Sequence, residues 1–577
     1  MTSTISRAMA RATMTISAAL MAGTLAAAVT PTSAAQSLVH DGDRWVCLGD
    51  SITAFNCYPP LLARVFAHYH PDATLTIVNS GHGGDTASAD PKKLAERVLQ
   101  YHPTIVSVMY GMNEAINLWG IGQPKEPIQE NYRAALTAIT RTLRAQGITV
   151  LLMSPSPTDV STHAYFALDK TDRFLAECAD IVRSVAQAEG AHYVPVHEAF
   201  TAFQADLPRG VALTGDGVHP SALGQYCIAR ALWQACGFAK PLSTGSDRPL
   251  QVERDPPPQV TVRLGSRFVS PGATGLELRL DATSAQTVEV TWSVAQKLAH
   301  QQGNAPIHAS PLARGAQTLE LVAGANTWTL PLAQEHVPSD IGRSADILLD
   351  LRVGDQRQLC IIDLSRTRVL HFKEDKVSGS LESELARPEG KRLATWEAQR
   401  LGDRLAVNIE VFDRELVSGN EVWPFSRDGL NLMFDFRPKE RFADIGVDRE
   451  VTQLFVNVRD EPFFATGLRA WTGWGMDFSS YVAASRTSTG YTIRLLMHDH
   501  FDLRRPAKLS DRDFIGLLVA VGEHATVNGA VAGSIVTNQH NDAPVYLYAN
   551  NLMILDLRDQ LPGDQVINAH LTTVQAP

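Results

Sequence analysis

Three residues near the two ends of one segment have the types and spacing that acyl transfer requires. Ser51 stands in "GDSIT" directly after an apolar run, and "GDGVHPSALGQ" (215–225) holds Asp216 and His219 three positions apart. A serine hydroxyl is a poor nucleophile near neutral pH, so it needs a base to take its proton and a carboxylate to orient that base. On a loop that leads into a helix, Asp216 can reach one imidazole nitrogen of His219 while the other nitrogen faces Ser51. The pattern predicts acyl transfer through a Ser-His-Asp triad.

The tetrahedral intermediate of such a reaction also needs hydrogen-bond donors for its oxyanion. Candidate donors are the Ser51 N–H, the Gly84 N–H in "NSGHGGDT" and the side-chain amide of Asn113 in "GMNEA". Taken singly, a Gly-Asp-Ser is more often a turn and a helix cap, and an Asn after a strand more often satisfies backbone groups. Only the joint order of the four blocks favours catalysis. Of the neighbouring polar residues, we expect His82 at the rim or in solvent, and Asp50 to fix the turn.

The elements that must position these residues form a repeated strand-helix pattern between residues 44 and 238. Short apolar runs such as "RWVCLG", "LTIVNSG" and "TIVSVMYG" alternate with longer helical periodicity, as in "IQENYRAALTAITRTLRAQ". This alternation predicts an α/β domain with a parallel sheet and helices on both faces. In such sheets function gathers at the carboxyl ends of the strands. The three turns that follow the strands should therefore meet at one edge.

The four blocks resemble those of the SGNH hydrolases, the GDSL esterase and lipase superfamily, over about 200 residues. The resemblance implies a three-layer α/β/α fold with a flavodoxin-like parallel sheet. It also implies the roles of five residues: nucleophile Ser51, general base and acid His219, orienting carboxylate Asp216, and oxyanion-hole residues Gly84 and Asn113. Many members carry Asp after the third-block Asn, where this chain has Glu114. That departure bears on substrate fit more than on catalysis.

Beyond Pro256–Pro258 the chain changes character, because helical periodicity largely stops and period-two alternation takes over. We therefore expect two all-β sandwich domains after the hydrolase. The predicted organisation is a signal peptide at 1–35, an SGNH hydrolase domain at 36–240, a β-sandwich spacer at 250–370 and a second β-sandwich at 372–577. The spacer region carries no recognisable motif.

The last region resembles family 9 carbohydrate-binding modules and their relatives. The resemblance rests on Val411 with Asp413, on Trp423 shortly before Asp428-Gly429, and on a strand that ends at Asp435. It implies a sandwich that binds sugars, sometimes with a structural calcium; no other cofactor and no catalytic metal is expected. Sugar rings stack on exposed aromatic side chains. The candidate substrate-binding residues are therefore Trp471 and Trp474 in "RAWTGWGMDFSSY". The alternative is that one or both fill the sandwich core.

The first residues predict a secretory signal. Arg7 and Arg11 precede an apolar stretch at residues 14–29, and the small residues Ser33–Ala35 follow where a signal peptidase cuts. The alternative, an N-terminal membrane anchor, is disfavoured because the apolar run is short for spanning. We therefore expect a secreted or periplasmic protein that has no membrane partner once the signal is removed.

Composition narrows the partners further. The 577 residues carry a formal net charge of −10 and no basic block, so the attraction to phosphate backbones that nucleic-acid binding requires is missing. Six cysteines show no CxxC or zinc spacing, which makes a thiolate metal site improbable, and no disulfide pairing is predicted. The sequence leaves the oligomeric state open.

The leading hypothesis is a carbohydrate esterase that takes acetyl or similar small acyl groups off a polysaccharide, the acylated carbohydrate being its partner. The C-terminal module would hold the polymer near the site. Two alternatives stay open: a lipase or thioesterase that acts on fatty acyl esters, and a carbohydrate-binding protein whose hydrolase domain is inactive.

Overall fold

The computed structural model describes most of the chain after residue 36. The described ranges are 37–55, 57–158, 168–206, 211–214, 217–238, 259–296, 306–308, 313–341, 343–383, 392–413, 429–437, 447–448, 451–457, 469–472, 482–497, 509–527, 530–537 and 552–575. Residues 36–577 group as one compact unit, separate from residues 1–35. The expected signal peptide therefore lies outside the described residues.

A mixed sheet with the strand order β11-β2-β1-β3-β4-β5 forms the centre of the N-terminal region. Five of its strands run parallel, as the sequence predicts, and the order of those five is flavodoxin-like. Most of their residues are buried, above all in β1, β3 and β4, because helices cover both faces. The parallel strands are β1 (Asp43–Gly49), β2 (Leu75–Gly81), β3 (Ile105–Met109), β4 (Thr149–Met153) and β5 (His192–Val194).

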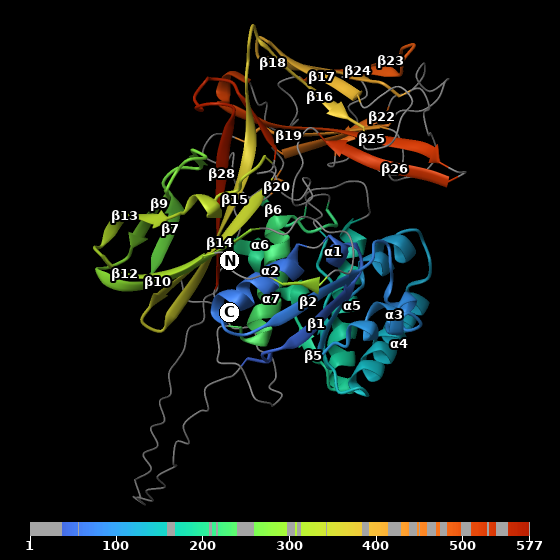
Figure 1. Ribbon diagram of the computed structural model, residues 1–577. Coiled ribbons are helices and arrows are strands. Elements are labelled where there is room, and N and C mark those ends of the chain that lie inside the picture. Colours follow the sequence, from blue (N-terminus) through green and yellow to red (C-terminus); the bar gives the residue numbers. More distant parts are fainter. Residues whose placement is uncertain are drawn as a thin grey trace, which may run out of the picture. The chain divides into compact units, whose positions relative to one another are not determined.

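Helices α2, α6 and α7 pack together on one side of this sheet, and α4 and α5 pack together on the other (Figure 1). In α4 the buried residues recur every three or four positions, from Ile128 to Leu143, which gives an apolar stripe toward the sheet. The helices are α1 (Ser51–Ala54), α2 (Tyr58–Tyr69), α3 (Leu94–Arg97), α4 (Lys125–Arg144), α5 (Leu168–Glu189), α6 (Val196–Asp206) and α7 (Ala222–Cys236). The result is the three-layer arrangement expected from the sequence.

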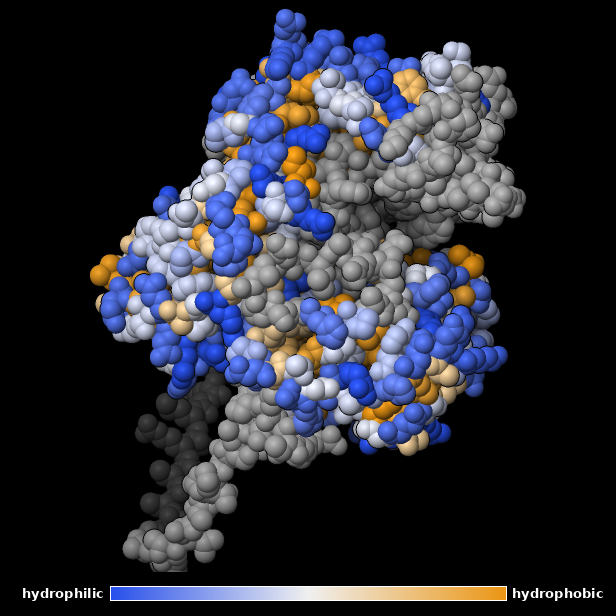
Figure 2. Space-filling model, in the orientation of Figure 1, coloured by the Kyte–Doolittle hydropathy of each residue, from blue (hydrophilic) through white to orange (hydrophobic). Residues whose placement is uncertain are grey.

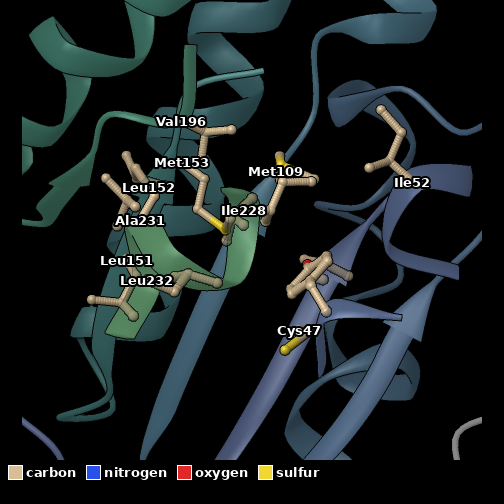
Figure 3. Close-up of a cluster of buried hydrophobic side chains, with 14 of the residues drawn as sticks. Cys47, Ile52, Met109, Leu151, Leu152, Met153, Val196, Ile228, Ala231 and Leu232 are labelled. Atoms are coloured by element: carbon tan, nitrogen blue, oxygen red, sulfur yellow. The ribbon is translucent and has the colours of Figure 1, made fainter. Parts of the chain in front are cut away.

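The core of this region lies between the sheet and its helices. Figure 3 shows Ile228 of α7 near Met153 of β4, with Met109 of β3 and Ile52 of α1 beyond them. These side chains are all at most 2% exposed. Because α1 and α7 contribute to one close-packed cluster, the helices next to Ser51 and His219 have a fixed separation.

The sheet also receives a strand from outside the hydrolase segment. Strand β11 (Pro306–Ile307) pairs antiparallel with β2, the outermost of the parallel strands, opposite Val78 and Ile77. The hydrophobic cluster of the hydrolase segment likewise takes in buried side chains from the following β region: Ile307, Leu348, Leu359 and Ile361. The region expected to be a spacer thus shares a core with the hydrolase segment, although its role stays a prediction.

Polar contacts cross the same junction. Arg64 of α2 forms an ion pair with Asp346 of β14 (Ser344–Val353), and their side chains are only 6% and 0% exposed. His68 Nδ1 lies 2.7 Å from Ser293 Oγ, within hydrogen-bond distance. A buried charge is tolerated only when it is paired. Helix α2, which follows the helix of Ser51, is therefore anchored on the β region.

Removing one member of this ion pair should destabilise the hydrolase segment. Asp346→Ala leaves the Arg64 guanidinium buried without its carboxylate, so we expect a loss of about 3 kcal/mol or more. Heat inactivation of ester hydrolysis should shift down by about 5 °C or more. The matched control is Asp355→Ala, which removes an exposed carboxylate from the turn after β14 and should change little. Equal inactivation temperatures in both variants would contradict a stabilising role for the pair.

Beyond the sheet of the hydrolase segment, the described residues form four further sheets. A twelve-stranded sheet has the path β12-β10-β14-β15-β27-β25-β19-β21-β22, with β26, β28 and β8 attached. Its long strand β15 (Gln356–His371) pairs with β14 on one side, and with β28 (Gln565–Gln575) and β27 on the other. The last strand of the chain thus returns to the first β region. The remaining bounds in this sheet are β8 (Phe268–Val269), β10 (Gln286–Gln296), β12 (Ala313–Leu321), β19 (Gly429–Asp435), β21 (Val451–Asn457), β22 (Arg469–Thr472), β25 (Phe514–Val527), β26 (Ala530–Thr537) and β27 (Met553–Asp556).

The other sheets are smaller and all antiparallel. One has the order β13-β9-β7 and another β16-β17-β18-β24-β23, and β20 pairs with β6. The region after the hydrolase is therefore rich in strands, as expected, while its identity as two sandwiches stays a prediction. The bounds are β6 (Val211–Ala212), β7 (Val260–Leu264), β9 (Gly275–Ala282), β13 (Gly324–Pro331), β16 (Lys376–Glu382), β17 (Arg392–Leu401), β18 (Arg404–Val411), β20 (Val447–Asp448), β23 (Val482–Arg486) and β24 (Tyr491–Met497).

The described surface is mostly hydrophilic on the face in Figure 2, with hydrophobic residues in small scattered groups. Within the described ranges the large hydrophobic side chains that stand exposed are Ile121, Val322 and Leu401. No helix among the described residues is long and apolar enough to cross a membrane.

Candidate active site

Ser51 is the first residue of α1, and Asp50 alone separates it from the end of β1. Asp50, rather than Ser51, caps this helix: its Oδ1 accepts a hydrogen bond from the Ile52 N–H at 3.0 Å. This agrees with the expectation that Asp50 fixes the turn. The Ser51 Oγ is then left to point elsewhere, and it lies 2.9 Å from His219 Nε2, within hydrogen-bond distance. The serine and the histidine, 168 positions apart, are therefore brought together as the sequence predicts.

His219 lies in a short loop before α7. Gly217 has a φ of 86°, a left-handed conformation that favours glycine, and an isolated bridge joins Thr214 to Pro220. The Phe55 ring, just after α1, lies 4.9 Å from the imidazole ring between centroids. These contacts hold the imidazole beside Ser51. The predicted orienting residue Asp216 lies outside the described residues, so its role stays a prediction.

The segment that follows β2, residues 82–87, is called the glycine turn and lies beside the nucleophile. Its start is fixed by the His82 N–H, which donates to the Gly49 carbonyl at 2.9 Å. A Cβ added at Gly83 would lie 4.0 Å from the Ser51 Cβ, whereas Gly84 has a φ of 81° and open space where a Cβ would be. The turn therefore leaves room for a substrate oxygen to approach its backbone. The His82 side chain is 70% exposed, as expected for a residue at the rim.

Asn113 follows β3 and is linked to the same turn. Its Nδ2 donates to the Asp85 carbonyl at 2.8 Å, while its Oδ1 accepts from Asn117 Nδ2 at 2.8 Å. A side-chain amide has two N–H groups, so a second one remains that could serve an oxyanion. Strand β1 lies between β2 and β3 in the sheet. The turn that carries Gly84 and the start of the helix Glu114–Trp119, which Asn113 precedes, thus lie on either side of Ser51.

Close packing accounts for the glycine at the end of β2. A Cβ at Gly81 would collide with the backbone of Thr53 and Ala54 in α1. Only glycine lets the helix of the nucleophile pass this near to the strand, because any side chain would push the two apart. Gly81 thereby helps to fix the distance between Ser51 and the glycine turn.

Two residues of this site were not assigned a role from the sequence. Glu114, noted only as a departure from the family pattern, accepts a hydrogen bond on Oε1 from the Ala87 N–H at 2.7 Å. Arg97 forms ion pairs with Asp85 and Asp90 and donates from Nη2 to the Ser80 carbonyl at 2.9 Å. Arg97 lies in none of the four blocks, and Glu114, although it lies in the third, was expected only to affect substrate fit; their contacts to distant segments reveal them. The strand-turn pattern around Asn113 could at most have marked Glu114 as a residue near the sheet edge.

Two carboxyl groups near the nucleophile are buried. Burial raises the pKa of Asp50 to about 7, against the opposing effects of the Ile52 N–H and the His219 charge. Burial likewise raises the pKa of Glu114 to about 7, with the Ala87 N–H opposing it. A carboxyl that is taken out of water without a full set of partners prefers its neutral form. Both groups therefore hold protons more readily than solvent-exposed acids do.

The residues expected to bind sugar lie largely outside the described part of the chain. Trp474 is outside it, as are Trp423 and Asp428. Trp471 is in β22, opposite Phe455 of β21, but only its backbone is described. The substrate-binding role of the two tryptophans stays a prediction.

The expected structural calcium also stays a prediction. Asp435, which ends β19, accepts from Arg437 Nε at 2.9 Å on Oδ1 and from Nη2 at 2.7 Å on Oδ2. Both side chains are 1% exposed, so at this strand end the Arg437 guanidinium pairs with the carboxylate. Across the described ranges, no three His, Cys, Asp or Glu side chains gather in a way that could hold a metal ion. The six cysteines are all buried: Cys47, Cys57, Cys178, Cys227, Cys236 and Cys360.

Comparisons with known proteins concern the same segment. Residues 47–226 match the model of the GDSL-like Lipase/Acylhydrolase family. The acetylxylan esterase of Geobacillus stearothermophilus is 24% identical over 217 residues, which make up 35% of this chain and 96% of that protein. These matches support an ester hydrolase domain of the GDSL/SGNH type in the N-terminal third of the chain.

Solved structures cover the same part. Axe2, an acetylxylan esterase from Geobacillus stearothermophilus, is 23% identical, covering 36% of this chain and 99% of its own with a TM-score of 0.31. LAE5, an alpha/beta hydrolase enzyme from the metagenome of Lake Arreo in Spain, is 22% identical, covering 35% of this chain and 99% of its own with a TM-score of 0.31.

Proposed function

We propose that this protein is a secreted serine esterase that removes acetyl groups from a polysaccharide or oligosaccharide. The observation that carries the proposal is the 2.9 Å separation of Ser51 Oγ and His219 Nε2 at the carboxyl edge of the parallel sheet. The acetyl group and the carbohydrate are suggested by the acetylxylan esterase relative and by the resemblance of the C-terminal region to carbohydrate-binding modules. Export is suggested by the signal-like first residues.

In the proposed reaction His219 Nε2 takes the proton of the Ser51 hydroxyl as its Oγ attacks the ester carbonyl carbon. The carbonyl oxygen becomes an oxyanion, and the Ser51 N–H, the Gly84 N–H and the Asn113 amide are the donors that would stabilise it. His219 then returns the proton to the departing sugar hydroxyl. In the second half of the reaction His219 takes a proton from water, which attacks the acyl-enzyme. His219 then returns that proton to the Ser51 Oγ, and acetate leaves. We assign the orientation of His219 to Asp216.

We propose a separate role for the C-terminal module, with Trp471 and Trp474 as its sugar-stacking residues. A module that holds the polymer raises the effective concentration of acetyl groups at Ser51 without touching the chemistry. Small esters would gain nothing from such a second attachment point.

The proposal predicts release of acetate from at least one acetylated polymer. Acetylated xylan, pectin, xyloglucan and mannan should be tested with the full chain, beside p-nitrophenyl acetate and a long-chain p-nitrophenyl ester. We expect acetate from one or more of the polymers and faster turnover of the short ester than of the long one, with Ser51→Ala as the blank.

The two alternatives give different results in this screen. Preference for the long-chain ester with no acetate from any polymer would indicate a lipase or thioesterase. No turnover of any ester, together with retention on a glycan, would indicate a carbohydrate-binding protein with an inactive hydrolase domain.

A further inference from the structure

Two consecutive residues hold the glycine turn at two points. The Asn113 Nδ2 donates to the carbonyl of Asp85, and the Glu114 Oε1 accepts from the N–H of Ala87, two residues further along. Asn113 and Glu114 follow β3, whereas the turn follows β2, and the strand between them leads to Ser51. The pair therefore spans the strand end that carries the nucleophile.

The far side of the turn is held by Arg97. This residue, 9% exposed, pairs with the side chains of Asp85 and Asp90, and the Ser80 Oγ donates back to its carbonyl at 2.7 Å. Asp85 is bound to Arg97 through its side chain and to Asn113 through its carbonyl. The hydrogen bond to Glu114 holds the backbone N–H of Ala87, two residues further along. Without that bond, the Asn113 contact to the Asp85 carbonyl would still join the end of β3 to the turn.

Glu114 is a costly residue at this position. Its side chain is 2% exposed, and within the described residues its second oxygen, Oε2, has no hydrogen-bond partner. Burying an apolar residue here would cost less free energy, because the carboxyl leaves one acceptor oxygen without a partner. A buried acid with a raised pKa beside a candidate nucleophile is more often found where function requires it. The other oxygen of Glu114, Oε1, accepts from the Ala87 N–H of the glycine turn.

We propose that Glu114 is a positioning residue for the oxyanion hole. By holding the Ala87 N–H it fixes the turn so that the Gly84 N–H and the second N–H of Asn113 converge on one point next to Ser51. The inference rests on the proposed function of this site as an esterase. Donors that are placed in advance stabilise a transition state without reorganisation, so a small displacement of the turn lowers the rate.

Three substitutions of Glu114 separate positioning from packing. Glu114→Gln keeps a carbonyl oxygen that can accept from the Ala87 N–H, Glu114→Asp shortens the side chain by one methylene, and Glu114→Ala removes the acceptor. On p-nitrophenyl acetate we expect kcat to fall by about 10-fold or more in the Ala and Asp variants with KM nearly unchanged, and Gln to restore most of it. Glu130→Ala, on the exposed side of α4, is the matched control and should keep the wild-type kcat.

A double-mutant cycle with Asn113→Ala tests the route of the effect. If Glu114 acts through the oxyanion hole, Glu114→Ala should lower kcat far less in the Asn113→Ala background than in the wild type. Additive losses, or equal kcat values in the Gln and Ala variants, would overturn the proposal. A wild-type kcat in a folded Glu114→Ala variant would overturn it as well.

Amide hydrogen exchange gives a readout that does not depend on turnover. Exchange at residues 84–88 should be faster in Glu114→Ala than in Glu114→Gln, because only the former frees the Ala87 N–H. Equal exchange in the two variants would overturn the positioning role. The wild-type protein could hydrolyse no ester while the two variants still differ in exchange. That result would count against the proposed function alone.

Discussion

Ser51→Ala is expected to lower the rate of ester hydrolysis by a factor of about 10³ or more and to leave the fold intact. The substitution removes only the oxygen that lies 2.9 Å from His219 Nε2. The helix that begins at this residue keeps its cap, since the cap is the Asp50 carboxylate and not the serine. The circular dichroism spectrum and its thermal unfolding midpoint should therefore match the wild type, as should retention on a glycan.

The measurement is turnover of p-nitrophenyl acetate by wild type and variant at equal concentration. Ser88→Ala is a matched control, because Ser88 lies beyond the glycine turn and contacts Thr86 at an exposed site. If Ser51→Ala kept most of the wild-type turnover, the nucleophile would have to be another residue. If Ser88→Ala lost as much as Ser51→Ala, the effect would lie in the stability of the edge and not in the chemistry.

Asn113→Ala should lower kcat by about 10²-fold or more while KM changes little. An oxyanion donor is needed mainly in the transition state, so its loss affects the chemical step more than substrate binding. Asn113 also ties Asp85 to the end of β3, and the loss therefore combines a missing donor with a loosened turn. Asn117→Ala is the milder companion variant, because it keeps the Asn113 amide and its contact to Asp85 and removes only the bond that orients the Asn113 oxygen.

The Asn117→Ala variant should lose less than the Asn113→Ala variant, since the donor itself remains. Steady-state kinetics of both variants on p-nitrophenyl acetate check the expectation. A change in KM with an unchanged kcat would place Asn113 in substrate binding rather than in the oxyanion hole.

Much of the fold of the hydrolase segment follows from local pattern. The runs "RWVCLG", "LTIVNSG" and "TIVSVMYG" became β1, β2 and β3, because continuous apolar runs between amphipathic helices have no stable place except a sheet covered on both faces. The same logic put Ser51, the glycine turn and Asn113 at one edge, where the structure has them. The pairing of Ser51 with His219 was predictable because each stands in a motif with its own spacing.

Other features depend on contacts that no local pattern records. Strand β11 is two residues long, and its place beside β2 is decided by packing between segments more than 200 positions apart. The ion pair of Arg64 with Asp346 and the hydrogen bond from Ala87 to Glu114 are likewise long-range contacts. In the sequence Arg64 and Asp346 read as ordinary polar positions, and Ala87 as an ordinary small residue. Periodicity predicts which face is buried, but not which partner a buried polar group will find.

The strand that the β region adds to β2 has a consequence for how this gene could have been assembled. The Geobacillus relative aligns over 96% of its length with about a third of this chain, so in that protein the hydrolase segment stands without the remaining β region. A recombination event at Pro256–Pro258 that exchanged everything downstream would uncover the backbone of β2 and the charge of Arg64. An open strand edge invites association with other chains, and a buried charge without its partner is destabilising. The unit that can be inherited or transplanted intact is therefore longer than the catalytic segment, and includes at least β11 and β14.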